Sequence, residues 1–347
     1  MKRAISKRHL LSVRNISKRF VTSTGLIRRK IIAATQAVDN VSFDLHVGET
    51  VGLVGGSGSG KSTLARIILR LIEADSGEVW FDGEPITSLA PDRMRLFRKD
   101  FQVVFQDPLH SLNPRRTVAE NIMRPLLNFG TARAAARLRA ESLMVTVGLN
   151  PATIDRYPHE FSGGQCQRIA IARALALKPR LLILDEPVSA LDVSVQAQIL
   201  NLLKSLQAEF NMTYLFVSHD LGLVRWMCDR TLVMYRGKLL ETGNSDVVHD
   251  QPAHPFTRDF IATVLTMSGD AKWADVAARL DDAETPAEVD EHGCIYAPVC
   301  SECRPVCRRK PPVLRHLPTG QAVACHLYEH TSENSAWIHQ RAAGVVS

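Results

Sequence analysis

Residues 55–63 have the types and spacing that bind a phosphate group. They read Gly-Gly-Ser-Gly-Ser-Gly-Lys-Ser-Thr and fit the pattern G-x-x-x-x-G-K-[ST]. Closely spaced glycines let the backbone wrap an anion, so that successive N–H groups and the positive end of the following helix face it. In such a loop Lys61 reaches the β and γ phosphates and the Ser62 hydroxyl ligates Mg²⁺. The segment predicts a nucleotide site formed by Gly55, Gly56, Ser57, Gly58, Ser59, Gly60, Lys61, Ser62 and Thr63.

Two adjacent carboxylates, Asp185 and Glu186, follow the apolar run 181–184. A continuous apolar run is typical of a strand buried on both faces, and open α/β sheets bind ligands at the C-terminal ends of such strands. Asp185 suits the shell of a Mg²⁺ ion, and Glu186 suits the polarisation of a water that attacks the γ-phosphate. An isolated Asp-Glu pair would indicate only a solvated strand end, but beside a phosphate-binding loop it predicts phosphoryl chemistry.

Other polar residues also lie at the ends of predicted elements. Gln106 follows the strand-like residues 101–105, and His219 follows the strand-like residues 214–218, where a γ-phosphate sensor would be expected. Residues 162–165, Ser-Gly-Gly-Gln, open a helix-like run. That tetrapeptide is a weak signal alone, because an N-cap serine and glycines before a helix are common.

The elements that must position these residues follow from hydrophobic periodicity. Residues 50–54 read as a short buried strand before the loop, and 11–20 and 38–47 alternate as strands. Residues 117–150 are mostly helical in pattern, with an Ala- and Arg-rich section that we interpret as a solvated helical face. After the loop, apolar residues recur at helical spacing at Leu64, Ile67, Ile68 and Leu71.

The composition indicates an ordinary globular chain. It has 347 residues, of which 45% are hydrophobic and 22% are charged, so two domains are the sensible expectation. No apolar run approaches the roughly 20 residues that cross a bilayer, and the basic start leads into no signal-peptide core. The net charge of +6 comes from residues 1–30, which carry ten Lys or Arg and no acid, whereas the remaining residues carry more acids than bases. We therefore expect no nucleic-acid partner.

Five of the seven cysteines crowd together near the C-terminus. Without an export signal, such clustering points to metal binding before disulfides. Four thiolates suit either a tetrahedral Zn²⁺ site or an iron–sulfur cluster, and reduced, unliganded cysteines are the plain alternative. The candidate ligands are Cys294, Cys300, Cys307 and Cys325, with Cys303 as a fifth thiol.

Together these motifs resemble the nucleotide-binding subunits of ABC transporters, over roughly residues 11–330. The resemblance implies that residues 55–63 are the Walker A loop, that 181–185 are Walker B and that Glu186 is the catalytic base of an ATPase. It further implies that Gln106 is the Q-loop glutamine, which senses Mg²⁺ and the membrane partner. His219 then resembles the switch histidine.

The same resemblance assigns a second set of residues to ATP binding. Residues 161–165 resemble the family signature, which includes Ser162, Gly163, Gly164 and Gln165. Residues 189–192 resemble the D-loop, which ends at Asp192, and Phe20 falls where the family has its adenine-stacking aromatic residue. The implied Mg²⁺ ligands are Ser62, Gln106 and Asp185.

The amino-acid sequences of the motifs resemble those of the dipeptide, oligopeptide and nickel importer group. The segments that carry this similarity are 106–115, 185–196 and 254–257. In that group the cysteine spacing is associated with a [4Fe-4S] cluster, which becomes the first choice over Zn²⁺. Two residues depart from the usual pattern, Gly56 and Cys166, and we expect activity to survive both.

The resemblance implies an α/β fold: a P-loop NTPase core of the ABC ATPase type, an antiparallel β layer, a helical subdomain and a C-terminal cysteine-rich extension. We expect a nucleotide-binding domain at 1–250 with a helical insert at about 107–178. The extension would cover 251–330, and 331–347 would be a flexible tail.

The implied partners are integral membrane permease subunits, an extracytoplasmic solute-binding protein that acts through the permease, and a second ABC ATPase, with a heterodimer favoured over a homodimer. The chain would be peripheral on the cytoplasmic face of the cell membrane and would power the import of peptides or a related small solute. The alternative is a soluble ABC ATPase that acts on nucleic acid or the ribosome. A third interpretation makes the cysteine cluster a redox or iron-sensing regulator.

Overall fold

The computed structural model describes residues 9–24, 30–266 and 293–329. The chain forms two compact units. Unit 1 comprises Met1–Val51 and Ser62–Ser218, and unit 2 comprises Gly52–Lys61 and His219–Ser347. Most of the phosphate loop therefore belongs to unit 2, although the segments on both sides of it belong to unit 1. The predicted tail 331–347 and the basic residues 1–8 lie outside the described residues.

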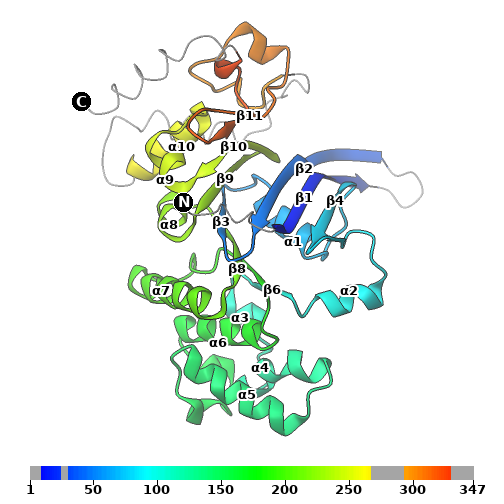
Figure 1. Cartoon of the computed structure of the whole chain (residues 1–347), viewed down its shortest axis with the longest axis vertical. Helices are drawn as coiled ribbons and strands as arrows, with labels where there is room; N and C mark the ends of the chain where they lie inside the picture. The colour runs from blue at the N-terminus through cyan, green and yellow to red at the C-terminus, as the bar shows by residue number, and fades with distance from the viewer. Residues whose placement is uncertain (1–8, 25–29, 267–292, 330–347) are drawn as a thin grey trace, which may run out of the picture. The chain divides into compact units, whose positions relative to one another are not determined.

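Unit 1 contains an antiparallel sheet with the strand order β2-β1-β4-β5 (Figure 1). Leu11 and Val13 of β1 are buried, as the alternating sequence predicts, and Ile16 is buried after a register shift in the β1–β2 pairing. This sheet is the predicted β layer. Its strands are β1 (His9–Thr24), β2 (Lys30–His46), β4 (Ser76–Phe81) and β5 (Glu84–Pro85).

A second group of strands in unit 1 is parallel. β7 (Leu181–Asp185) pairs on one side with β6 (Phe101–Val104) and on the other with β8 (Thr213–Ser218). Every residue of β7 and β8 is buried, which explains their continuous apolar sequences. The predicted strands are confirmed, and the parallel register brings the residues after β6 and β7 to the same edge.

The phosphate loop joins β3 (Thr50–Val54), which is buried throughout, to α1 (Lys61–Ile68). The predicted strand–loop–helix order is confirmed. The prediction that Leu71 continues the apolar face of α1 is wrong: the helix ends at Ile68 and Leu71 is 47% exposed. Arg70 adopts a left-handed φ of 50°, which ends the helical backbone before Leu71.

The remaining helices of unit 1 include the predicted helical region. α4 begins with a capping box in which Thr117 and Glu120 satisfy each other's backbone N–H groups. α4, α5 and α6 pack on one another (Figure 1). The helices are α2 (Pro91–Phe97), α3 (Pro108–Ser111), α4 (Val118–Asn128), α5 (Arg133–Thr146), α6 (Gly163–Leu175) and α7 (Val193–Phe210), with 3₁₀ turns η1 (Pro151–Thr153) and η2 (Pro158–Glu160).

Unit 2 contains antiparallel strands in the order β9-β10-β12-β11. The strands are β9 (Arg230–Tyr235), β10 (Lys238–Asn244), β11 (Arg315–His316) and β12 (Ala322–Val323). The helices are α8 (Leu221–Met227), α9 (Ser245–Asp250) and α10 (Pro255–Thr266), with 3₁₀ turns η4 (Pro305–Arg308) and η5 (His326–Tyr328).

The carboxylate of Glu241, on β10, anchors the C-terminal segment of unit 2. It is fully buried and accepts hydrogen bonds from the N–H groups of Ala253 and His254 and from Nε2 of Gln321, at 2.8, 2.9 and 3.0 Å. Burial raises the pKa of Glu241. The three donors tie β10 to the segment before α10 and to the residue before β12. In the described part of the chain, no helix is long and apolar enough to cross a membrane.

Candidate functional site

The phosphate loop in unit 2 is shaped by glycines and by its lysine. Gly58 and Gly60 have φ values of 69° and 98°, which favour glycine. The Lys61 side chain is only 5% exposed, and its ammonium donates to the carbonyls of Gly55 and Gly56 at 2.8 and 2.7 Å. The loop therefore wraps a buried positive charge, which is the arrangement that attracts a phosphate.

Gly55 and Gly56 differ in the space around them. A Cβ on Gly55 would lie 2.0 Å from the carbonyl oxygen of Met234 and 2.8 Å from Oγ of Ser59, whereas a Cβ on Gly56 would meet no atom within 4 Å. The loop is thus closed around Gly55 and open at Gly56. A side chain at position 56 would therefore have room, so the backbone packing does not require glycine there.

We expect Gly55→Ala to weaken ATP binding by more than about tenfold and to lower the free energy of unfolding by about 1–3 kcal/mol, because the Met234 carbonyl must move. Gly56→Ala is the matched comparison, and its effect on stability should stay within about 0.5 kcal/mol. A fluorescent ATP analogue and urea unfolding measure the two quantities. Equal losses of ATP affinity and of the free energy of unfolding in Gly55→Ala and Gly56→Ala would contradict the proposed packing of the loop.

In unit 1 the predicted Mg²⁺ ligands and the predicted base form two hydrogen-bonded pairs. Ser62 Oγ donates to Oδ1 of Asp185 at 3.0 Å, and Nε2 of Gln106 donates to Oε2 of Glu186 at 3.0 Å. Asp185 and Glu186 are consecutive, so the two pairs are neighbours. A hydroxyl and a carboxylate oxygen side by side are the hard donors that Mg²⁺ prefers. The structure thus places Ser62 beside Asp185 and Gln106 beside Glu186.

The backbone at Glu186 is unusual. Its φ is 49°, a left-handed value that costs a non-glycine residue energy. The Glu186 N–H donates to the Val217 carbonyl at 2.9 Å, and its carbonyl accepts from the N–H and Oγ of Ser189 at 3.3 and 3.2 Å. These bonds hold the backbone turn directly after β7, from which the Glu186 carboxylate reaches Gln106.

Sequence reasoning missed Gln167. This residue of α6 is fully buried, and its Nε2 donates to the Pro187 carbonyl at 2.6 Å. A glutamine two residues after Ser-Gly-Gly-Gln gives no sign in the sequence that it is buried or that it touches the segment after β7. Only the packing of α6 reveals it.

The residues at 162–165 begin α6 as predicted. Ser162 is the N-cap, and it exchanges hydrogen bonds with Gln165 in a capping box. Ser162, Gly163 and Gln165 are exposed, so the positive end of the helix faces solvent. This is a ready anion-binding end of a helix.

Three further residues predicted for the ATP site are Asp192, Phe20 and His219, and each lies at or near the end of a different helix or strand. Asp192 is the N-cap of α7 and accepts from the Val195 N–H at 3.0 Å; this backbone hydrogen bond lowers the pKa of Asp192. Phe20, on β1, is 45% exposed, with the Lys18 ammonium 5.7 Å from its ring centroid. His219 directly follows β8 and belongs to unit 2.

The four predicted metal-ligand cysteines line one cavity in unit 2. Its lining includes Cys294, Cys300, Cys307 and Cys325, and it does not include Cys303. Burial raises the pKa of Cys300 to about 11 and that of Cys325 to about 12. Among the described residues, however, no group of three or more His, Cys, Asp or Glu side chains is arranged to hold a metal ion. The thiols share a cavity without forming a coordination shell.

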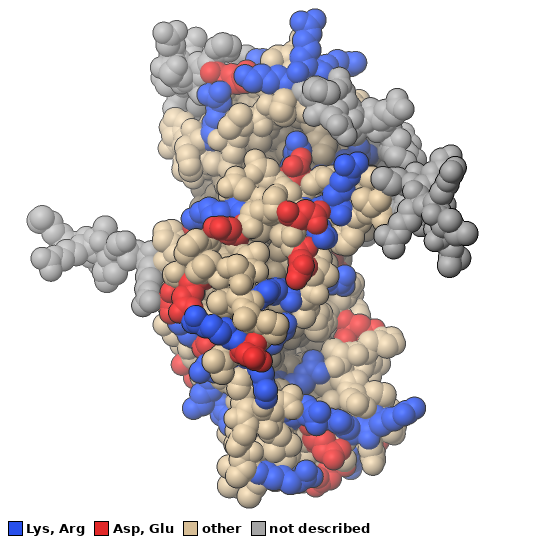
Figure 2. All heavy atoms as spheres, turned by 90° about the vertical axis from the view of Figure 1, so that its right-hand side faces the viewer, with Lys and Arg blue, Asp and Glu red and all other residues tan. Residues whose placement is uncertain are grey.

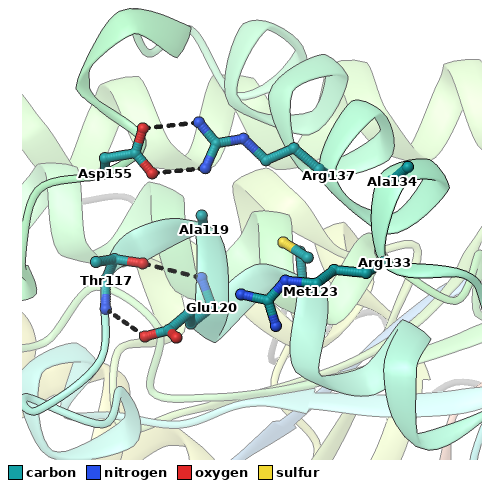
Figure 3. Close-up of a pocket in the computed structure, with 8 residues that line it drawn as sticks. All are labelled: Thr117, Ala119, Glu120, Met123, Arg133, Ala134, Arg137 and Asp155. Atoms are coloured by element: carbon teal, nitrogen blue, oxygen red, sulfur yellow. Dashed lines mark hydrogen bonds and ion pairs between the residues drawn. The ribbon is translucent and has the colours of Figure 1, made fainter.

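Unit 1 has an open groove of about 590 Å³ between α4 and α5. Figure 3 shows the Arg137 guanidinium paired with both oxygens of Asp155, at 2.5 and 2.8 Å, on one side of it. Arg133 also lines the groove, and it has no hydrogen-bond or ion-pair partner among the described residues. The lining residues are Thr117, Ala119, Glu120, Met123, Arg133, Ala134, Arg137 and Asp155, and none of them is a predicted nucleotide contact.

Comparison with known proteins gives consistent matches. A family model described as "ABC transporter" matches residues 38–189. The oligopeptide transport ATP-binding protein AppF of Bacillus subtilis (strain 168) is 44% identical over 330 residues, which cover 94% of this chain and 99% of that protein. The oligopeptide transport ATP-binding protein OppF of Escherichia coli (strain K12) is 46% identical over 282 residues, or 80% of this chain and 84% of that protein.

Solved structures agree. The ATP-binding cassette MJ0796, in a dimeric post-hydrolysis state bound to ADP and Pi, superimposes with a TM-score of 0.60 at 31% identity. The superposition covers 68% of this chain and 98% of the MJ0796 chain. CbiO1 of Clostridium perfringens, part of the ABC transporter complex cbiONQ, also gives 0.60, at 26% identity, and covers 79% of this chain and 99% of that one.

Proposed function

This chain belongs to the ABC transporter family of ATPases, and from that membership we propose that it is the ATP-hydrolysing subunit of an importer for peptides. The observation that carries the proposal is the pair of contacts beside β7, Ser62 with Asp185 and Gln106 with Glu186. They gather Mg²⁺-binding oxygens and a carboxylate base in one cluster. Peptides as the solute class are supported by relatives named as oligopeptide transport proteins that align over nearly the whole chain.

We propose these roles for the residues at the ATP. Lys61 and the loop N–H groups of residues 55–63 hold the phosphates, and Phe20 stacks on the adenine ring. Glu186 orients a water and accepts its proton as the water oxygen bonds to the γ-phosphorus and the bond to the β-phosphate oxygen breaks, which releases ADP and phosphate. His219 hydrogen-bonds the γ-phosphate.

Ser62, Gln106 and Asp185 are the proposed Mg²⁺ ligands. Their oxygens fit the ion, since Ser62 and Asp185 already lie within hydrogen-bond distance of each other. Bound Mg²⁺ would supply positive charge that offsets the negative charge developing on the phosphates. Asp185, buried at the end of β7, supplies the fixed negative charge of this set.

We propose that the ATP site is completed by a second ATPase subunit. The exposed start of α6, Ser162–Gln165, would contact the γ-phosphate bound to that partner, and Asp192 lies in the segment that would line the interface. The intact motifs make this chain a hydrolysing member, and a heterodimer is favoured because the importers it resembles usually pair two different ATPases. The ATP-bound closed dimer would then open on hydrolysis.

The membrane contact is proposed on the helical insert, residues 107–178, within a nucleotide-binding domain that covers residues 1–250. This location is supported by the groove between α4 and α5, where Arg133 has no ion-pair partner within the described part of the chain. Two apolar residues of α5, Leu138 and Val145, are 68% and 62% exposed seven positions apart, so they share one helix face. A permease subunit that docks here would hold the chain at the cytoplasmic face of the membrane, and a solute-binding protein would signal through the permease.

The experiment is to purify the chain with its permease and measure ATP hydrolysis with and without a peptide-loaded binding protein. The proposal predicts stimulation by the peptide-loaded protein. The alternative is a soluble ATPase that acts on nucleic acid or the ribosome, and hydrolysis stimulated by nucleic acid without a permease would favour it. Over the middle of the face in Figure 2, Lys and Arg lie among Asp and Glu, which does not favour a nucleic-acid surface there.

We also propose that the C-terminal extension, residues 251–330, holds a metal centre on Cys294, Cys300, Cys307 and Cys325. The proposal is supported by the shared cavity and by the chemistry of four thiols, which suits a [4Fe-4S] cluster first and Zn²⁺ second. A bound metal would tie together parts of the extension separated by 31 residues, from Cys294 to Cys325. The thiols would have to close around it, since they form no coordination shell as they stand.

Cys307→Ser is expected to abolish most of the metal content, whereas Cys303→Ser should retain it, because Cys303 does not line the cavity. Metal analysis and the visible absorbance of anaerobically purified protein measure the difference. Iron with visible absorbance would identify the cluster, and zinc without absorbance would identify the single ion. A metal-free wild type, or equal loss in both variants, would refute this ligand set. The redox-regulator interpretation additionally requires that ATPase activity change with the state of the centre.

A further inference from the structure

The buried amide of Gln167 links two functional segments of unit 1. It lies one turn into α6, is 0% exposed, and donates from Nε2 to the Pro187 carbonyl at 2.6 Å. A carbonyl oxygen can only accept, so the amide nitrogen must face it. Among the described residues Oε1 of Gln167 has no donor, so the Pro187 contact is what fixes the orientation of this amide.

Pro187 directly follows Glu186, whose left-handed backbone is strained. Proline has no N–H, so its carbonyl is the sole hydrogen-bonding group that its backbone offers. The bond from Gln167 therefore restrains the Pro187–Val188 peptide, one residue after the strained Glu186, whereas the Val217 and Ser189 contacts hold the backbone of Glu186 itself. A shift of about 1 Å in a catalytic group can cost about a hundredfold in rate.

The start of α6 is fastened to the same region. A Cβ on Gly164 would lie 2.5 Å from Cγ1 of Val195, so the glycine allows α6 to approach the first turn of α7 closely. Arg168 extends the contact by donating to Oε1 of Gln198, on α7, at 3.3 Å. α6 is thus held on both sides of Gln167 by the segment that follows Glu186.

We propose that Gln167 is a positioning residue, which couples the Ser162–Gln165 end of α6 to the turn that carries Glu186. The inference rests on the proposed function. In an assembled dimer the start of α6 would contact the partner's ATP, while Glu186 would act on this chain's own ATP. Through Gln167, a displacement of the start of α6 moves the turn that carries Glu186, and the reverse also holds. The two ATP sites of a dimer are therefore linked within a single subunit.

The test compares Gln167→Met with Tyr214→Phe in the assembled complex. Both remove one buried hydrogen bond from a side chain to a backbone carbonyl in unit 1, since the Tyr214 hydroxyl donates to the Leu203 carbonyl at 3.0 Å. We expect Gln167→Met to lower kcat by about tenfold with KM for ATP within about twofold, because positioning and not binding is lost. Tyr214→Phe should leave kcat within about twofold of the wild-type value. The two variants should lower Tm by similar amounts, because each loses one buried hydrogen bond.

A second variant covers the case in which Gln167→Met does not fold. In Gln167→Glu, a protonated carboxyl can donate to the Pro187 carbonyl and an ionised one cannot, and burial keeps the carboxyl protonated to higher pH. Its kcat relative to wild type should therefore rise as the pH falls from about 8.5 to about 6.

Three results would overturn the inference. The first is a kcat equal to that of the wild type, either in Gln167→Met or at every pH in Gln167→Glu. The second is an equal loss of kcat in Tyr214→Phe. The third is failure of both Gln167 variants to fold while Tyr214→Phe folds, which would give Gln167 a purely structural role. Wild-type protein without ATPase activity would instead refute the proposed function.

Discussion

Glu186→Gln is expected to lower the rate of ATP hydrolysis by about 10²–10⁴-fold while ATP binding is retained. The amide cannot accept the proton of the attacking water, yet it has nearly the same size and can still meet Gln106, whose Nε2 lies 3.0 Å from Oε2 of Glu186. The β7 strand and its buried core are untouched by the change. The variant should therefore bind ATP and persist in the closed, ATP-bound dimer.

Phosphate release measures the rate, and gel filtration with and without ATP measures the dimer. Glu209→Gln makes the same chemical change at an exposed position on α7 and should leave both unchanged. Hydrolysis by Glu186→Gln at the wild-type rate would remove Glu186 from the role of base.

Lys61→Met should have the second largest effect, a loss of about a hundredfold in ATP affinity. A charge-assisted hydrogen bond is worth about 1.5–3 kcal/mol, and the Lys61 ammonium is the buried positive charge of the loop. Methionine keeps most of the side-chain volume but cannot donate to a phosphate oxygen. Binding, and not only turnover, should therefore fail.

Titration with a fluorescent ATP analogue measures this affinity. Lys99→Met, at an exposed position before β6, removes a lysine of the same type outside the loop and should bind normally. A folded Lys61→Met protein that binds ATP with wild-type affinity would contradict the loop assignment.

The two effects separate the functions of neighbouring parts of the chain. On the proposed roles, Lys61 affects binding because it belongs to the phosphate loop, whereas Glu186, which directly follows β7 and contacts Gln106, affects chemistry. Gly55→Ala should resemble Lys61→Met, since it deforms the same loop against the Met234 carbonyl.

Much of the site could be predicted from sequence because its signals are local. β7 is recognisable since a strand buried on both faces needs a continuous apolar run, and the carboxylates after it stand out for that reason. The strand before the phosphate loop and the Ser162 cap of α6 are confirmed for similar reasons. Each of these features depends on only a few consecutive residues.

Features that depend on contacts between distant segments were not predictable. Gln167 and Pro187 are 20 residues apart, and nothing in the sequence shows that a glutamine of α6 is buried against the turn after Glu186. Helix periodicity extended α1 to Leu71, but the backbone turns left-handed at Arg70. The cysteine spacing set Cys303 apart from the four candidate ligands, but it could not show that those four line one cavity without forming a coordination shell.

ATP-driven peptide import is measured as peptide uptake by the complete transporter in proteoliposomes, assembled from the permease, the binding protein and both ATPase subunits. We expect ATP-dependent accumulation of peptide with the wild-type chain, and loss of at least about 99% of the initial rate when this chain carries Glu186→Gln. Uptake at the wild-type rate by the transporter that contains Glu186→Gln would contradict this expectation.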